Sequence, residues 1–212
     1  MPDNPVITPS DITKNMIINR SNVQDKVYLN FEKITDHLKK QLSEIESSKN
    51  DMPSLSYPCS VEFYNGEIIE NAILHNMDEY LKQGGILYSR EVFADDENKI
   101  SQIKRIFPSK NRLPIKFSKE VHTYCETGMG YLFFYFLFDD GSEKLVVGGS
   151  AANFYDLPEG YDLKNIVGVR QFNREKDKRT DDNIEPSNVA IFRYRESTKR
   201  PSSGNPFYEL SE

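Results

Sequence analysis

The feature that most constrains this chain is a run of eight consecutive apolar residues, from Tyr131 to Phe138. The run is followed by Asp139-Asp140-Gly141 and then by a second apolar segment, Leu145 to Val147. Aspartate and glycine between two such segments predict a hairpin, because residues in a tight turn must tolerate positive φ. A strand that is apolar at every position leaves no face for water, so we expect a central strand covered on both sides. The run is far too short to cross a bilayer as a helix, which takes about 20 residues.

A second hairpin is predicted where Asn65-Gly66 separates the segment beginning at Val61 from the segment ending at Leu74. The chain also contains 13 Phe and 12 Tyr, residue types that favour strands and bury large areas. We therefore expect an α+β fold with a β-rich globular core over residues 55–172. Its sheet is expected to be mainly antiparallel and partly closed like a barrel.

A long amphipathic helix is predicted ahead of this core, over residues 21–50. Ser21 and Gln24 have the spacing of a capping box. Apolar residues then recur in steps of three and four and form one stripe along the helix. The stripe consists of Val27, Phe31, Ile34, Leu38, Leu42 and Ile45. Because an isolated helix is marginal in water, the stripe needs a partner surface. We expect that surface to be the sheet of the same chain, with a second copy and a different protein as alternatives.

The two ends of the chain are predicted to lie outside the core. Residues 1–20 are interpreted as a flexible arm. Residues 173–212 are interpreted as a polar linker and tail, with one possible strand at 189–194, because their first part is charged and almost devoid of apolar residues. Cys59 and Cys125 do not form a disulfide framework, and no apolar signal segment follows the first methionine. We therefore expect a cytoplasmic protein that does not associate with a membrane.

The net charge of the chain indicates which classes of partner it can bind. The formal net charge is -6, and nucleic acid is therefore not an expected partner, because phosphate binding draws on excess Lys and Arg. The segment from Lys104 to Lys116 is locally basic. Within its proline-bounded loop, Lys110 and Arg112 could hold a carboxylate or phosphate, and Lys116 adds positive charge. A solvated basic loop is the plainer interpretation, and RNA binding through this segment is a further alternative.

The candidate catalytic group consists of His122, Cys125 and Glu126. On a helix these residues would be neighbours, since they are spaced three and four apart. A cysteine beside a histidine can become a thiolate nucleophile. The interpretation that we prefer is that Cys125 is a small buried core residue. The segment supplies too few ligands for a metal, and no cofactor-binding motif is present, so we expect neither a metal nor a cofactor.

The hairpin from Val61 to Leu74, together with Asp78, resembles the opening of an Sm-like barrel. In that family an Asn-Gly turn leads into a second strand and an aspartate. The resemblance implies a small, strongly bent antiparallel sheet. Asn71 stands where the family has a second glycine, and the spacing of Asp78 differs. The resemblance therefore carries no function over to this chain.

These observations predict a non-enzymatic binding or interaction module, of the accessory, adaptor or immunity type. Its expected partner is another protein or a second copy of the chain. One alternative is a small enzyme that uses Cys125 and His122 as a nucleophile and base, with Arg112 or Lys110 holding an anionic substrate. The other alternative is an RNA-binding small β-barrel.

Overall fold

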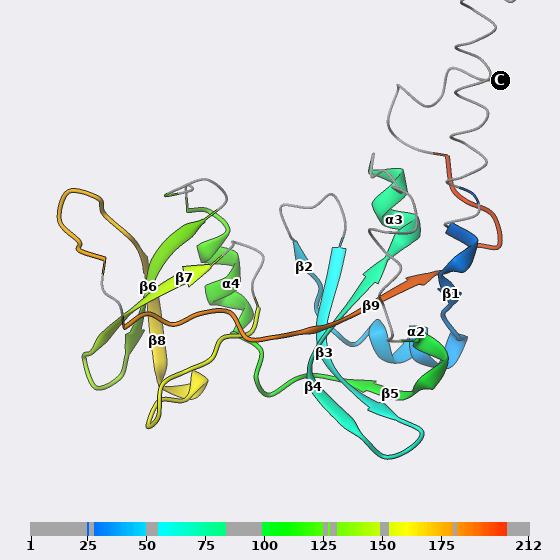
Figure 1. Ribbon diagram of the computed structural model, residues 1–212, viewed down its shortest axis with the longest axis horizontal. Helices are drawn as coiled ribbons and strands as arrows, with labels where there is room; N and C mark the ends of the chain where they lie inside the picture. Colours follow the sequence, from blue (N-terminus) through cyan, green and yellow to red (C-terminus); the bar gives the residue numbers. More distant parts are fainter. Residues whose placement is uncertain are drawn as a thin grey trace, which may run out of the picture.

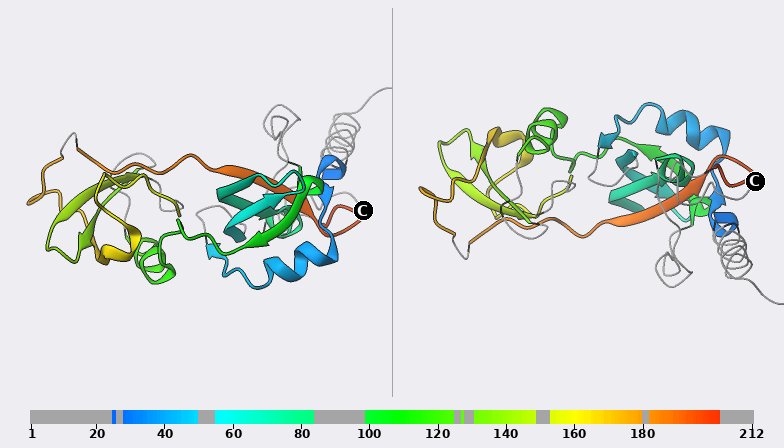
Figure 2. Two further views of the ribbon diagram at one scale, coloured as in Figure 1. Left: turned by 90° about the horizontal axis from the view of Figure 1, so that it is seen from below. Right: turned by 90° about the horizontal axis from the view of Figure 1, so that it is seen from above.

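The computed structural model describes residues 25, 28–49, 55–83, 99–124, 127, 131–148, 153–179 and 182–202. Helices and strands in these residues form two lobes joined by two connections (Figures 1 and 2). The larger lobe holds a curled mixed sheet with helices α2 and α3, and the smaller lobe holds a three-stranded sheet with helix α4. The chain leaves the larger lobe after Phe107 and returns to it at Ala190. The smaller lobe is therefore an insertion between two strands of the larger sheet.

The smaller lobe is built around β6 (Leu132–Phe138), which pairs antiparallel with β7 (Glu143–Gly148) on one side and β8 (Ile166–Gln171) on the other. The predicted central strand and its hairpin are thus confirmed. Gly141 in the turn has a φ of 81°, which a residue with a side chain rarely adopts. One face of β6 is buried together with residues of α4 (Ile115–Val121). These β6 residues are Leu132, Phe134, Phe136 and Phe138.

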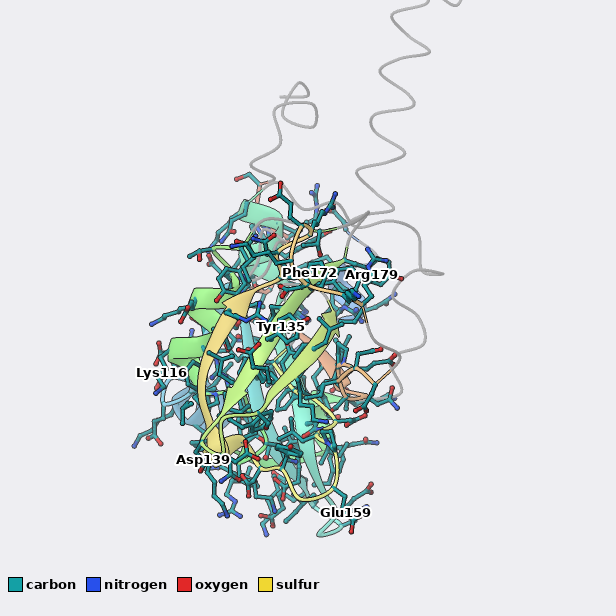
Figure 3. The ribbon with its side chains drawn as sticks, turned by 90° about the vertical axis from the view of Figure 1, so that its left-hand side faces the viewer. Lys116, Tyr135, Asp139, Glu159, Phe172 and Arg179 are labelled. Carbon is teal, nitrogen blue, oxygen red and sulfur yellow. The ribbon has the colours of Figure 1, made fainter. Side chains whose placement is uncertain are left out.

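The other face of the small sheet carries aromatic and arginine side chains. The rings of Tyr135 and Phe172 are stacked with centroids 6.2 Å apart, and Figure 3 shows both near the same end of the sheet as Arg179. The guanidinium of Arg170 lies 4.0 Å from the Tyr135 centroid and is held by Asp177 at 2.8 Å. Asp177 and Arg179 belong to the segment predicted as a polar linker. Part of that segment is therefore docked on the sheet through charged and cation–π contacts.

The sheet of the larger lobe has the order β1-β9-β4-β3-β2, with β5 also paired to β3. The hairpin of β3 and β4 turns at Gly66, where φ is 88°, as the Asn-Gly pair predicts. Pairing is antiparallel among β2, β3, β4 and β5 and parallel where β9 meets β1 and β4. The strands are β1 (Glu32–Lys33), β2 (Ser48–Lys49), β3 (Leu55–Phe63), β4 (Ile68–Asn76), β5 (Ile103–Phe107) and β9 (Ala190–Arg195). Short helical segments are α3 (Met77–Lys82), η2 (Ile100–Gln102) and, in the smaller lobe, η3 (Leu163–Asn165).

Strand β9 occupies the interior of the larger sheet although it comes from the predicted tail. Phe192 pairs with Leu74 in the register of β4. The side chains of Phe192 and Tyr194 are at most 1% exposed, and both belong to the main core cluster of this lobe. The core of the chain therefore extends past residue 172, and the larger lobe needs its last strand to be complete.

The structure does not show the long helix predicted over residues 21–50. Glu32 and Lys33 form β1 and pair with β9, and the Ile34 amide donates to the Arg195 carbonyl at 3.0 Å. Helix α2 (Asp36–Leu42) begins only after Thr35, whose side chain accepts from the Leu38 amide. The backbone between residues 31 and 35 thus forms sheet hydrogen bonds in place of helical ones. Thr35 is an N-cap of the preferred type, a helix-start signal that the apolar periodicity obscured.

The apolar stripe is nevertheless buried inside the chain. Phe31 packs with Tyr28, Met77 and Leu81, while the rest of the described stripe joins the core of the larger sheet. The members of this second group are Ile34, Leu38, Leu42 and Ile45. The described stripe residues are at most 8% exposed, so their partner surface is the same chain. Val27 and the predicted arm, residues 1–20, lie outside the described residues. In the part of the chain that is described, no helix is long and apolar enough to span a membrane.

Candidate functional site

A cavity of about 440 Å³ lies between the two lobes. One wall is a single face of α4, because its residues are spaced three and four apart. The opposite wall is the segment between α2 and β2, and the connection from β5 to α4 contributes an arginine. The α4 residues are Ile115, Ser118, Lys119 and His122; the others are Glu46, Ser47, Ser48 and Arg112.

Arg112 is held at the cavity by only part of its guanidinium group. Its Nη1 donates to the backbone carbonyl of Glu46 at 2.6 Å. Its Nε is buried and has no hydrogen-bond partner in the described part of the chain. Burial lowers the pKa of Arg112, an effect that the nearby Glu46 charge opposes, but a guanidinium remains protonated in proteins. The Nε of Arg112 is therefore a buried, positively charged donor with no acceptor among the described residues.

Ser118 presents a second donor of the same kind. The residue is 7% exposed, and within the described residues its Oγ makes no hydrogen bond. A serine inside a helix commonly donates to the carbonyl four residues earlier. Here that carbonyl, on Pro114, accepts from the Ser118 and Phe117 amides instead. An unpaired buried hydroxyl costs about 1–3 kcal/mol, so its presence beside Arg112 calls for an acceptor from outside the chain.

The rim of the cavity is charged. Lys119 Nζ lies 2.7 Å from a carboxylate oxygen of Glu46, and this hydrogen bond lowers the pKa of Glu46. The pair is exposed and contributes little to stability. With Glu46 neutralised by Lys119, the charge of Arg112 is left in excess.

The sequence candidates are brought together only in part. Arg112 and His122, which the small-enzyme alternative places in one site, line the same cavity. Lys110 instead pairs with Glu70 at 3.3 Å, and the Lys116 ammonium lies 4.4 Å from the centroid of the neighbouring Phe117 ring. Neither of these lysines lines the cavity. Cys125 and Glu126 lie outside the described residues.

The remaining cations of the basic segment are paired with carboxylates. Lys104 and Arg105 both contact Glu62, at 2.6 and 2.8 Å. Such pairing removes much of the free positive charge that RNA phosphates would need. Among the basic residues from Lys104 to Lys116, Arg112 is the one that lines the cavity.

Sequence reasoning missed Ser118 and Lys119, although a signal was present. Ser118 and His122 are four apart and stand beside the apolar positions Phe117 and Val121, so they form a polar stripe next to the apolar face. The sequence around Glu46 has no pattern that predicts its position in the opposite wall, because the contact with α4 joins segments far apart in the chain.

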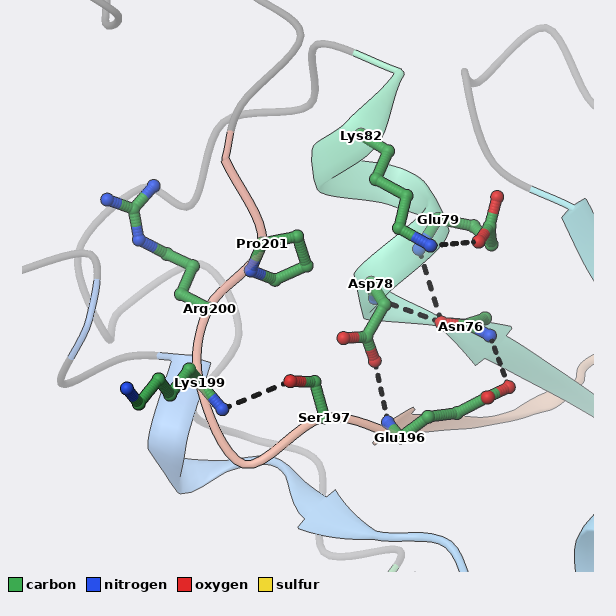
Figure 4. A pocket seen from close by; sticks show the side chains of 9 residues that line it. All are labelled: Asn76, Asp78, Glu79, Lys82, Glu196, Ser197, Lys199, Arg200 and Pro201. Atoms are coloured by element: carbon green, nitrogen blue, oxygen red, sulfur yellow. Dashed lines mark hydrogen bonds and ion pairs between the residues drawn. The ribbon is translucent and has the colours of Figure 1, made fainter.

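A second hollow of about 470 Å³ lies where β9 ends beside α3 (Figure 4). Its buried aspartate, Asp78, accepts from the Tyr28 hydroxyl at 2.8 Å and from the Glu196 amide at 2.6 Å. Asn76 Nδ2 donates to Glu196 at 2.9 Å, and Lys82 Nζ lies 2.8 Å from Glu79. These groups satisfy one another. The network therefore ties β9 to α3, and no described residue of its lining holds a buried side-chain donor without a partner.

Comparisons with protein-family models, with curated proteins and with solved structures each found no significant match. Among the residues that the structure describes, no three histidine, cysteine or acidic side chains are grouped so as to hold a metal. The functional argument therefore rests on the geometry of the cavity between the lobes.

Proposed function

We propose that the protein is a non-enzymatic binding module that recognises an anionic group of another molecule in the cavity between its lobes. The observation that carries this proposal is that Arg112 and Ser118 line one cavity and that each holds a buried donor, Nε and Oγ, with no acceptor among the described residues. Buried polar groups are almost always paired in folded proteins. A carboxylate or phosphate oxygen would satisfy both donors and neutralise the arginine.

The proposal fits the expectation of a partner protein, which would present the anion as an acidic or phosphorylated side chain. It also fits the polar side chains of Ser118 and Lys119, which α4 places beside Ile115 on the face toward the larger lobe. The cavity uses groups from both lobes, so recognition depends on the assembled chain.

Thermal unfolding in the presence of simple anions tests the proposal. Sodium phosphate, sulfate and acetate would be compared with chloride at constant ionic strength. An anion at about 100 times its Kd stabilises by about 2.7 kcal/mol, which corresponds to a rise in Tm of about 5–10 °C for a chain of this size. Arg112→Lys keeps the charge but removes Nε, and should abolish the rise. Lys116→Gln, in α4 but outside the cavity, is the matched control and should keep it.

Two results would show the proposal to be wrong. One is that none of the anions raises Tm above the chloride value. The other is that the rise is equal in Arg112→Lys and Lys116→Gln.

A further inference from the structure

We infer that the anionic group is a phosphomonoester attached to an organic body, with its phosphate held by Arg112, Ser118 and Lys119. This inference rests on the proposed function and narrows its ligand class. Three properties of the cavity lead to it: its charge, the directions from which its donors come, and its size.

The charge of the cavity favours a group with more than one negative charge. Arg112 is unpaired at Nε, while Lys119 is already matched by Glu46. Arg112 and Lys119 thus bring two positive charges to the lining, and the Glu46 carboxylate at the exposed rim opposes one of them. A phosphomonoester carries about 1.5–2 negative charges at pH 7, whereas a carboxylate carries one. The Glu46 carboxylate at the rim disfavours polyphosphates, which would bring further negative charge against it.

The donors surround the cavity on separate elements. Arg112 comes from the connection before α4, Ser118 and Lys119 come from α4, and Ser47 comes from the facing segment of the larger lobe. A carboxylate has two coplanar oxygens that match one edge of a guanidinium. A phosphomonoester has three terminal oxygens that point in different directions. The phosphomonoester therefore offers more acceptor directions to donors on separate elements than a carboxylate does.

The size of the cavity leaves room for more than the phosphate itself. Its volume of about 440 Å³ falls within the range of about 300–1,000 Å³ found for small-molecule pockets. A free phosphate has five heavy atoms and would leave most of this space to water. The side chain of Ile115 lies along the same wall and offers apolar contact to the organic body.

Isothermal titration of the full chain tests the inference with four probes at constant ionic strength. The probes are a short peptide containing phosphoserine, the same peptide with aspartate in its place, glucose 6-phosphate and inorganic phosphate. We expect the phosphoserine peptide or glucose 6-phosphate to bind at least about tenfold more tightly than both the aspartate peptide and inorganic phosphate. Preference for the phosphopeptide would identify a side-chain source, and preference for glucose 6-phosphate would identify a small-molecule source.

Two variants test the charge argument directly. Glu46→Gln frees Lys119 and raises the local positive charge, so it should tighten phosphomonoester binding by about three- to tenfold. Arg112→Lys should weaken it by about tenfold or more, and Lys116→Gln should leave it unchanged. Weaker binding by a folded Glu46→Gln variant would overturn the inference.

The remaining outcomes separate this inference from the proposed function. If the aspartate peptide binds as tightly as the phosphoserine peptide and both depend on Arg112, the cavity is an anion site but not a phosphomonoester site. If none of the probes binds, or if Arg112→Lys binds as the unsubstituted chain does, both proposals fail together.

Discussion

Replacing Ser118 by alanine should stabilise the protein while weakening its binding of anions. Ser118 is 7% exposed, and its Oγ has no hydrogen-bond partner within the described residues. Folding therefore removes this hydroxyl from water without giving it a replacement. Alanine has no such group to desolvate, so the folded state gains relative to the unfolded one.

The magnitude follows from two contributions of the same sign. Removing an unpaired buried hydroxyl is worth about 1–3 kcal/mol. Alanine also exceeds serine in helix propensity by about 0.5 kcal/mol, and residue 118 lies inside α4. The loss of packing around one oxygen atom offsets part of this gain. We expect a net increase of about 1 kcal/mol in the free energy of unfolding, which raises Tm by about 2–4 °C.

Ser60→Ala is the matched control, because Ser60 is a fully buried serine whose hydroxyl is satisfied. Its Oγ donates to the Glu70 carbonyl at 3.0 Å and lies 2.9 Å from the Glu70 carboxylate. Alanine at this position removes hydrogen bonds to the part-buried Glu70 acceptors and should lower the free energy of unfolding by about 1–2 kcal/mol. Chemical denaturation and calorimetry of both variants should therefore give opposite signs.

The reasoning is refuted if Ser118→Ala destabilises the fold. A gain no larger than the helix-propensity contribution of about 0.5 kcal/mol, with anion binding unchanged, would also refute it. Such a result would show that the Ser118 hydroxyl is neither unsatisfied nor part of the site. Stabilisation combined with weaker phosphate binding is the result expected for a group kept in the cavity for its ligand.

Three further predictions concern the core. Phe192→Ala should lower the free energy of unfolding by about 3–5 kcal/mol, because the side chain is fully buried in β9. Calorimetry should show a much smaller loss of stability for Val189→Ala, which lies just outside the strand. Similar losses for the two variants would contradict the interior placement of β9. Leu38→Ala should cost about 2–5 kcal/mol with no change of mass in light scattering, whereas a halved mass would mean that the stripe joins two copies. Burial raises the pKa of Cys59 to about 12, so its contribution to stability is complete below the unfolded value of about 8.5 and is lost as pH rises toward 12. The free energy of unfolding should therefore fall between pH 8 and 10 more steeply in the unsubstituted chain than in Cys59→Ala, by about 1 kcal/mol per pH unit on average. Equal slopes would contradict this assignment.

The hairpins could be predicted because their information is local. The turns at Gly66 and Gly141 have φ values of 88° and 81°, and each joins two apolar segments that are close in sequence. The unbroken apolar run likewise required that β6 be covered on both sides. In both cases the decisive residues lie within one hairpin, so no distant contact was needed to interpret them.

The N-terminal helix shows where periodicity alone misleads. Residues spaced three and four apart in a stripe are buried whether one helix carries them or whether a short strand interrupts it. Phe31 lies on one side of the interruption and Ile34 on the other, and they pack into different clusters. Hydrogen bonds from residues 32–34 to β9 decide that a short strand, and not a helix, forms here. Strand β9 is more than 150 residues away in the sequence.

Part of the candidate site could be predicted from the sequence. Arg112 and His122 could be named from their chemistry, and the polar stripe of α4 could be read from its spacing. That they share one cavity with Glu46 depends on how the two lobes meet. Whether Arg112 Nε lacks a partner also depends on burial, which no local pattern reports.

By itself the sequence determined the strand-rich composition, the two hairpins and the burial of the apolar stripe, since each follows from side-chain chemistry over a few neighbouring residues. The tertiary structure alone decided that residues 190–195 enter the interior of the larger sheet. It also decided that the stripe is broken by β1 and that α4 faces the segment around Glu46. The physical reason is that parallel pairing and contact between lobes join segments far apart in the chain, and the entropy of closing such loops is offset only when the whole core forms.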